Sequence, residues 1–521
     1  MSTDNWRRIY LAAFVGALPG FSIAETPLSA IDWLSDSVSA PAGSTFGEPV
    51  EQPKDTEDDA KVSIDASPEA VLVSPIRPTF ADGVGLVPAG TIGWPANLWA
   101  GSTSGDIIRR LTAERLDILP AMQEVLYSLL LAEVDPPSDS GPDARLFMAR
   151  IDTLLSLGAL EQAQAMLDQA GPTTPELFRR KFDTALLLRT EDYVCNQMRD
   201  IPSLSPTFPA RIFCLARGGD WQAAALTLET ARALGFVNDE EDALLARFLD
   251  LVPTSPEDPL PIPSRPSPLE FRMYEAIGEA LPTAGLPRAY AHSDLHNNVG
   301  WKAQLEAAER LAKSGAIDPN RLLGYYIARK PAASGGVWER VAAIQSLENA
   351  LAARDVGALK AAVPAAWQAM ESVELEVPFA RLYGGQLARI PALHSDPQVL
   401  HIALLSWDYQ NLVSGFEPQN QDDLFLYSIA QGRPAPFRPK EPMQQAIQDG
   451  FRATRLPVRL QALAADGRRG EAILRAMELF ENGSLGDLDE LTDAIAFFNV
   501  TGLDDIARKA ALQLMLLDRR G

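Results

Sequence analysis

The strongest constraint on the fold is a recurring spacing of apolar residues at three- and four-residue steps. The first such run starts at Asp106 and continues to Leu130. Its apolar members are Ile107, Leu111, Leu116, Leu119, Met122, Val125, Leu126, Leu129 and Leu130. This period places them on one face of an α-helix. Similar segments follow in pairs with Gly or Pro between them, so we expect an all-α fold built from helical hairpins.

Composition and charge limit the function further. The 521 residues are 46% hydrophobic and 22% charged, which suffices for a large core and more than one domain. The formal net charge of −23 describes a strongly acidic surface. Such a surface repels phosphate backbones and anionic lipids, which argues against nucleic-acid binding and against peripheral membrane docking.

Residues 1–24 have the three parts of a secretory signal peptide. Arg7 and Arg8 precede an apolar run of ten residues, Ile9 to Leu18, which is about half of what a bilayer-spanning helix needs. Ser22-Ile23-Ala24 offers a cleavage site, so the mature chain is expected to start at Glu25 in the periplasm with no membrane span. The alternative is an uncleaved membrane anchor.

The remaining chain divides by composition. Residues 25–84 are rich in Pro, Ser and acidic residues and are expected to form a disordered linker. Residues 85–252 should form an N-terminal helical-hairpin domain, which begins with an irregular strap, Gly85 to Gly101. Residues 253–268 read as a Pro-rich linker, and 269–521 as a C-terminal helical-repeat domain. The sequence leaves open whether the two bodies form one superhelix.

One spacing recurs within the helical regions. Gly158, Ala163, Leu167, Ala170 and Pro175 fall at offsets of 0, 5, 9, 12 and 17, and the first four offsets recur from Gly219 to Ala231. The Gly-to-Ala step returns at Gly467 with Ala472 and at Gly502 with Ala507. This pattern resembles a degenerate tetratricopeptide repeat, in which Gly lies in the hairpin turn and the small residue lets two helices approach. The resemblance implies an α-solenoid with a concave binding surface.

Cys195 and Cys214 are the only two cysteines, and they lie on either side of a Pro-containing turn. Export would place them in an oxidising compartment, where we expect a disulfide. The alternative is a pair of buried, reduced thiols. A redox role is not expected, because the sequence has no Cys-x-x-Cys.

The sequence contains no recognisable catalytic or cofactor motif, and neither a cofactor nor a metal is expected. His292 and His296 lie one helical turn apart with Asp294 between them, which are residue types and a spacing that a zinc site could use. No Glu follows His292, as hydrolytic zinc helices require, and Ser293-Asp294 reads as a helix N-cap.

The candidate binding surface is the segment from Tyr325 to Trp338. It combines Tyr325, Tyr326, Arg329, Lys330 and Trp338 beside a Gly-rich turn in an otherwise acidic chain. Aromatic residues and Arg dominate the energy of protein interfaces. The alternative is that Tyr and Trp belong to the core while Arg and Lys cover a helix end.

These features predict a non-catalytic periplasmic scaffold or adaptor that binds envelope proteins or peptides. The alternative is a peptidoglycan-binding or lytic-transglycosylase-associated superhelical protein. Soluble lytic transglycosylases also carry a long helical superhelix, with a catalytic Glu followed by Ser. Glu371-Ser372 is the dipeptide that could match, but the Gly-Leu-Met-Gln type of segment does not follow it.

Overall fold

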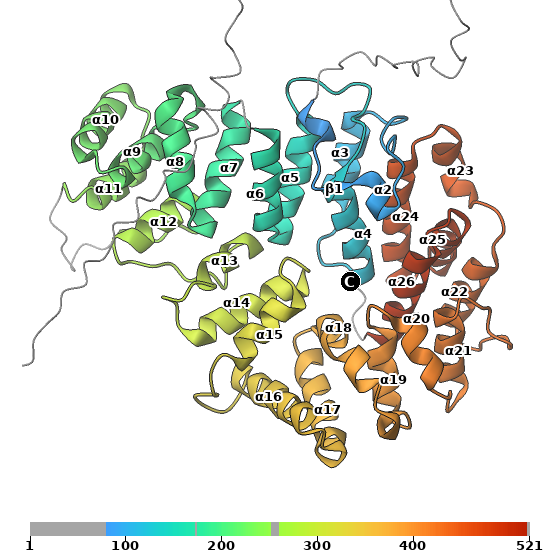
Figure 1. The fold of residues 1–521 in the computed structure, drawn as a ribbon. Helices are drawn as coiled ribbons and strands as arrows, with labels where there is room; N and C mark the ends of the chain where they lie inside the picture. The colour runs from blue at the N-terminus through green and yellow to red at the C-terminus, as the bar shows by residue number, and fades with distance from the viewer. Residues whose placement is uncertain (1–79, 172–173, 252–259, 518–521) are drawn as a thin grey trace, which may run out of the picture. The chain divides into compact units, whose positions relative to one another are not determined.

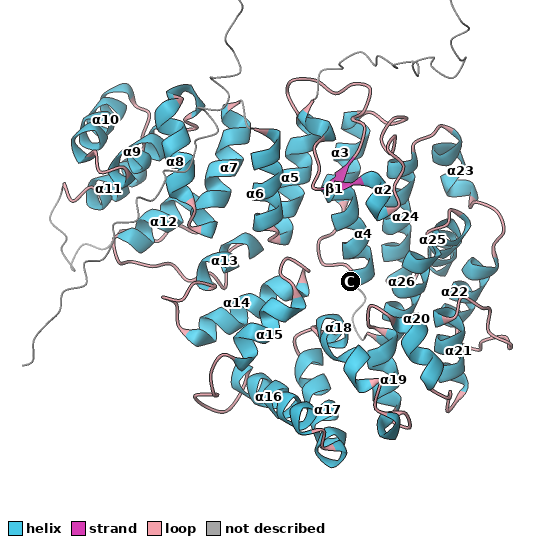
Figure 2. Cartoon of the chain, in the orientation of Figure 1, coloured by secondary structure: helices cyan, strands magenta, loops and turns pink. Residues whose placement is uncertain are grey.

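The computed structural model describes residues 80–171, 174–251 and 260–517, which are 67% helical with almost no strand (Figure 2). These residues belong to one compact unit, Arg77–Gly521. They form 25 α-helices, α2 to α26, and one pair of two-residue strands, which confirms the all-α prediction. None of these helices is both long and apolar enough to cross a bilayer. The expected signal peptide at 1–24, residues 25–79 of the expected disordered linker, and residues 252–259, most of which belong to the expected Pro-rich linker, lie outside the described residues.

The N-terminal part of this unit is organised around one buried arginine. Its elements are η2 (Ala81–Gly83), β1 (Val87–Pro88), α2 (Ala89–Ile92), α3 (Ser104–Ala113), α4 (Pro120–Leu131) and β2 (Ala132–Glu133). The strands pair in parallel, with Val87 opposite Ala132. Arg150 is 1% exposed and donates hydrogen bonds to the carbonyls of Asp82, Val84, Leu130 and Ala132. Burial lowers the pKa of its guanidinium to about 10, so it stays charged at neutral pH and ties the segment just before the strap to the end of α4.

Antiparallel helices then follow one another along the chain (Figure 1). They are α5 (Arg145–Leu157), α6 (Leu160–Ala170), α7 (Pro175–Leu188), α8 (Glu191–Asp200), α9 (Phe208–Arg217), α10 (Trp221–Leu234) and α11 (Asp239–Phe248), with η3 (Pro202–Leu204) before α9. Each helix packs against the next. This part of the fold is compatible with a solenoid of helical hairpins.

The second half continues in the same manner. It comprises α12 (Pro268–Ala276), η4 (Arg288–Tyr290), α13 (Ala291–Asp294), α14 (Trp301–Lys313), α15 (Pro319–Ile327), α16 (Val337–Ala353), α17 (Val356–Glu371), α18 (Glu376–Leu387), η5 (Pro391–Leu393), α19 (Pro397–Leu404), α20 (Tyr409–Leu412), η6 (Val413–Gly415), α21 (Gln421–Ala430), α22 (Pro442–Arg452), α23 (Val458–Ala465), α24 (Arg469–Ser484), α25 (Leu488–Val500) and α26 (Asp504–Leu516). Neighbouring helices pack in pairs here as well, for example α16 with α17 and α24 with α25.

The recurring Gly-to-Ala step marks hairpin turns throughout the unit. The four glycines have left-handed backbone angles, with φ of 83° at Gly158, 84° at Gly219, 73° at Gly467 and 82° at Gly502. Each follows the first helix of a pair, where glycine adopts positive φ without steric cost. The residues five positions later, Ala163, Ala224, Ala472 and Ala507, are at most 1% exposed. The five-residue step from Gly to Ala therefore marks places where the two helices of a pair are in close contact.

The two cysteines form a disulfide, as predicted. Cys195 lies on α8 and Cys214 on α9, with their Cα atoms 5.0 Å apart. Both are buried in a core formed by α7 to α12, next to Phe213. The bond therefore joins α8 to α9, that is, the second helix of one hairpin pair to the first helix of the next.

Helix α12 follows the Pro-rich segment but packs with the helices before it. Its Leu269, Met273 and Tyr274 belong to the same hydrophobic cluster as residues of α7, α9 and α11. The larger cluster holds residues from Ala89 to Leu177 together with residues from Ala291 to Leu517. Core packing is thus continuous across the boundaries drawn from composition.

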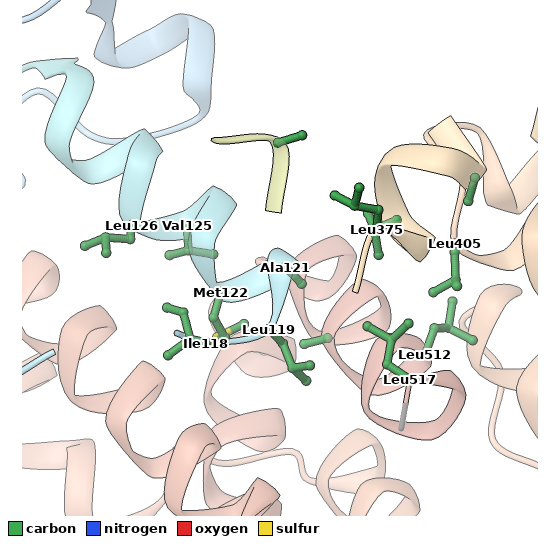
Figure 3. Close-up of a cluster of buried hydrophobic side chains, with 14 of the residues drawn as sticks. Ile118, Leu119, Ala121, Met122, Val125, Leu126, Leu375, Leu405, Leu512 and Leu517 are labelled. Atoms are coloured by element: carbon green, nitrogen blue, oxygen red, sulfur yellow. The ribbon is translucent and has the colours of Figure 1, made fainter. Parts of the chain in front are cut away.

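The helices at the two ends of the described chain contact each other. Helix α3 packs on α24, and α4 packs on α26. Apolar side chains of α4 and its preceding loop, including Leu119 and Met122, lie beside Leu512 and Leu517 (Figure 3). Polar contacts accompany them, since the backbone N–H of Ala121 donates to Gln513 Oε1 at 2.7 Å.

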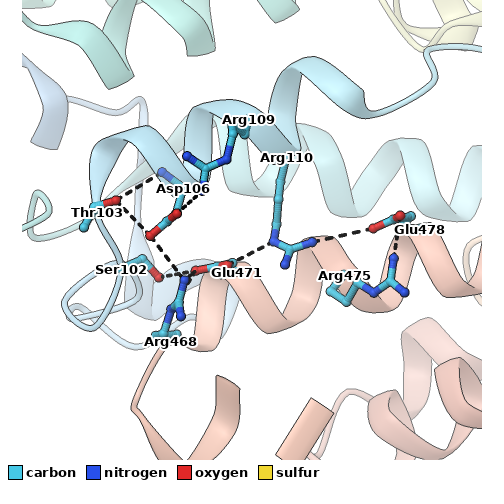
Figure 4. A network of polar contacts seen from close by, with 9 residues as sticks. All are labelled: Ser102, Thr103, Asp106, Arg109, Arg110, Arg468, Glu471, Arg475 and Glu478. Carbon is cyan, nitrogen blue, oxygen red and sulfur yellow. Dashed lines mark hydrogen bonds and ion pairs between the residues drawn. The ribbon is translucent and has the colours of Figure 1, made fainter. Parts of the chain in front are cut away.

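A buried carboxylate forms the polar centre of this contact between the ends (Figure 4). Glu471 of α24 is 3% exposed and accepts from Ser102 Oγ at 3.1 Å, Arg110 Nε at 3.1 Å and Arg468 Nε at 2.8 Å. Arg110 also pairs with Glu478, and Arg468 with Asp106. We call this network the Glu471 clasp.

Candidate functional site

The aromatic members of the segment Tyr325 to Trp338 are largely packed inside the protein. Tyr326 is 2% exposed and donates its hydroxyl to Glu309 Oε1 at 2.7 Å, and Arg340 holds the same carboxylate through Nε at 2.7 Å and Nη2 at 2.6 Å. Burial raises the pKa of Tyr326 well above its usual value. Tyr326 is therefore a core residue and has no surface to offer a partner.

Tyr325 and Trp338 are half-buried, whereas Arg329 and Lys330 are exposed. The rings of Trp301 and Trp338 are 5.1 Å apart, and Trp301 Nε1 donates to the Tyr325 carbonyl at 3.0 Å. The structure thus brings the aromatic residues together around α14 and leaves the two cations at the end of α15. This arrangement corresponds to the alternative in which the aromatics pack and the cations cover a helix end.

His292 is held by a structural hydrogen bond. His292 is 2% exposed, and its Nε2 lies 2.6 Å from the carbonyl of Gly158. Burial lowers the pKa of His292 to about 4, which keeps the ring neutral. In the part of the chain that the structure covers, no three His, Cys, Asp or Glu side chains are grouped so that they could hold a metal ion.

Glu371 and Ser372 are exposed at the end of α17. The Ser372 hydroxyl donates to the carbonyl of Ala369 at 2.7 Å. Neither residue lines any of the cavities discussed below. Both side chains are therefore in contact with solvent.

An apolar groove lies between the strap and the C-terminal hairpins, and we call it the strap groove. Its volume is about 610 Å³. Trp94 and Leu98 form one wall, and Ala464, Ile473 and Phe497 form the other. A groove of this size and lining accommodates one or two bulky apolar side chains.

Close backbone contacts fix the strap against α24. The N–H of Gly470 donates to the carbonyl of Leu98 at 3.1 Å, and Trp99, which is 1% exposed, packs directly over Gly470. A Cβ atom at position 470 would lie only 2.1 Å from Cζ3 of the Trp99 ring, so only glycine fits there. Trp94 is oriented by its Nε1, which donates to Ser128 Oγ at 3.2 Å.

The side chain of Arg469 lies at the edge of the strap groove. Arg469 lines the groove and is exposed. It makes no ion pair within the described ranges, in contrast to its neighbour Arg468, which pairs with Asp106 and Glu471. The strap groove therefore combines an apolar floor with one available positive charge in an acidic protein.

Sequence patterns could not locate this groove. Neither Trp94 nor Arg469 belongs to a sequence pattern that indicates a binding site. The groove arises because segments more than three hundred residues apart are brought together. Comparison with known proteins adds no constraint, since no protein-family model, no curated protein and no solved structure matches this chain.

Proposed function

We propose that this protein is a non-catalytic periplasmic scaffold or adaptor that binds partner proteins of the cell envelope in the strap groove. The groove is the observation that carries the proposal. Its apolar walls accept bulky apolar side chains, and Arg469 at its edge favours a nearby carboxylate. The occupant is therefore an extended peptide of a partner protein that carries a bulky apolar residue next to Asp or Glu.

Two further observations support this function. The helical hairpins with Gly turns and buried Ala residues are what degenerate tetratricopeptide-type units would provide, and such arrays commonly bind peptides. The disulfide fits an oxidising compartment, in keeping with the signal peptide expected at residues 1–24. Intact-mass analysis of periplasmic protein should give a chain that starts at Glu25. A mass that retains residues 1–24 in the membrane fraction would contradict the export part of the proposal.

The groove itself is tested with matched substitutions on one helix. Ala464 lines the strap groove, while its neighbour Ala465 is exposed on another face of α23. Peptides selected from a random library on the mature protein should lose at least tenfold in affinity for Ala464→Phe and bind Ala465→Phe as well as the native protein. Peptides that bind both variants equally would place the binding surface elsewhere.

The charge preference is tested in the same assay. Arg469→Glu should weaken peptides with an acidic residue, whereas Arg455→Glu should not, because Arg455 is exposed and outside the groove. Release of sugar fragments from purified peptidoglycan by the native protein would instead favour the lytic-transglycosylase-associated alternative.

A further inference from the structure

A second cavity lies where five separate parts of the chain meet, and we call it the Trp407 cavity. Its volume is about 380 Å³. Helices α4, α6 and α18, the turn between α14 and α15, and the loop after α19 all contribute to its lining. It shares no lining residue with the strap groove. Small-ligand pockets span about 300–1,000 Å³, so this volume suits a small ligand better than a folded segment.

One wall is an aromatic ring held in place by a cation. Trp407 is 57% exposed, although large apolar side chains are usually buried. The guanidinium of Arg381 lies 3.9 Å from the centre of its ring, and Lys509 Nζ lies 5.9 Å from it. Cation–π contacts of this kind restrict the indole, while the residue as a whole stays more than half exposed.

The charged side chains of the cavity already have partners. Arg381 pairs with Glu124 of α4, and Lys313 Nζ lies 2.7 Å from Glu374 Oε2. Asp318 accepts from the N–H of Asn320 at 2.8 Å as the cap of α15. A charged ligand would have to lose its hydration without gaining an unpaired opposite charge, which is unfavourable. The cavity therefore favours a neutral ligand.

Two amide side chains are available for hydrogen bonds. Gln123 is 5% exposed and lines the cavity, and its side-chain amide makes no hydrogen bond to the described residues. Gln162 lines the cavity as well, and its Oε1 is buried without a partner among those residues. An amide offers both donors and an acceptor, so each of these side chains can form hydrogen bonds with a ligand. A ligand with amide and hydroxyl groups would satisfy both glutamines.

We propose that the Trp407 cavity binds a neutral, amide-bearing sugar ring, of the class of N-acetylated hexosamines. A pyranose has an apolar C–H face that packs on an indole, and its hydroxyl edge and acetamido group match the free amides of Gln123 and Gln162. A peptide backbone also carries neutral amides but presents no flat apolar face for the ring. This site stands independently of the strap groove and adds a sugar-binding activity to the protein.

The test is calorimetric titration of the mature protein with tri-N-acetylchitotriose, with cellotriose as a sugar without acetamido groups. We expect binding of the first and at least tenfold weaker binding of the second. Monomeric N-acetylglucosamine shows whether the ligand is a free sugar or a glycan chain. An affinity for the monomer close to that for the trimer indicates a single-ring site for free sugar. A much higher affinity for the trimer indicates a site for a glycan chain. No binding of chitotriose at millimolar concentration, or equal binding of cellotriose, would overturn the proposal.

Matched variants locate the site. Trp407→Ala and the volume-conserving Gln123→Met should each weaken chitotriose binding at least tenfold, whereas Trp221→Ala should leave it unchanged. Trp221 is a suitable control because it is 51% exposed and lies on α10 outside the cavity. Thermal unfolding checks that each variant is folded, and Trp407→Phe, which keeps a flat ring, should retain most of the affinity.

Binding that is equal in all variants would refute this location. Displacement of the sugar by N-acetyl-trialanine amide at similar concentration would assign the cavity to peptides instead. Because Ala464→Phe fills only the strap groove, it should not affect chitotriose binding, so failure of either proposal leaves the other testable.

Discussion

Replacing Glu471 by Gln should destabilise the contact between the two ends of the helical array. The substitution keeps the volume but removes the charge and turns one acceptor oxygen into a donor. Three donors face this carboxylate, from Ser102, Arg110 and Arg468. Each hydrogen bond to a charged group contributes about 1.5–3 kcal/mol, and Gln can keep only part of them.

The magnitude is limited by what remains around the two arginines. Arg110 and Arg468 are 28% and 27% exposed, and each keeps a second carboxylate, Glu478 or Asp106. Neither cation is left buried without a partner, so the cost falls below the roughly 3–5 kcal/mol of a fully broken buried pair. We expect Glu471→Gln to lower the free energy of unfolding by about 2–3 kcal/mol.

Glu478→Gln is the matched control on the same helix. Glu478 pairs with Arg475 at 2.5 Å and with Arg110 at 3.6 Å, but its side chain is 46% exposed. Exposed ion pairs contribute about 0–1 kcal/mol, so this variant should differ little from the native protein. Urea unfolding followed by circular dichroism gives both values, and hydrogen exchange of α3 and α24 locates the effect. An equal loss of unfolding free energy in the two variants would refute the idea that the burial of Glu471 makes its contacts more stabilising than those of Glu478.

Three other perturbations test separate features. Replacing both Cys195 and Cys214 by Ser should lower the free energy of unfolding, measured in urea, by about 3 kcal/mol, which is the chain-entropy value for a loop of this length. Thiol labelling of the native protein without reductant should find no free cysteine. Burial and nearby carboxylates of α24 raise the pKa of Glu114 to about 8, so the folded state binds this proton more tightly than the unfolded chain. The stability that this group contributes is present below the unfolded pKa of about 4.5 and is lost as pH rises toward 8. The melting temperature of the native protein should therefore fall over this pH range, and that of Glu114→Gln should fall less. Gly470→Ala should destabilise strongly, because its Cβ would overlap the Trp99 ring, whereas Gly486→Ala has open space around its Cβ and should suffer only from its positive φ.

Local features of this fold could be predicted from the sequence because they depend on near neighbours. Gly158 and Ala163 mark a hairpin turn and a close helix contact five residues apart, and the structure places them as expected. Cys195 and Cys214 lie close in sequence, and a turn brings them together. The three- and four-residue spacing of the apolar residues and the residue types at the turns are sufficient for both predictions.

Long-range contacts could not be predicted in this way. The hydrogen bond from Ser102 to Glu471 joins residues 369 positions apart, and no pattern in either segment indicates it. Tyr326 looked like an interface residue because of its type, but its burial depends on Glu309 and Arg340 from two other helices. Trp407 carried no signal because its partners, such as Arg381, are recognisable only once the helices are packed.

Contact between the ends also couples stability to binding. In an open solenoid each repeat touches only its neighbours, but here one wall of the strap groove belongs to the N-terminal strap and the other to the C-terminal hairpins. A peptide bound in the groove as proposed would contact both walls, so it would bind only the state in which the ends are joined. The apparent dissociation constant then equals the intrinsic value divided by the fraction of molecules with joined ends.

This relation gives a prediction for a residue that does not line the groove. Glu471→Gln weakens the junction by about 2–3 kcal/mol, yet the apolar contact of α4 with α26 remains. If the ends stay joined in most molecules, the affinity for a groove peptide should be unchanged in water and should fall before global unfolding as urea is added. Titration of the peptide at increasing urea concentration measures this, with Glu478→Gln as control. Affinity that declines only together with the global unfolding signal would show that the ends do not separate independently.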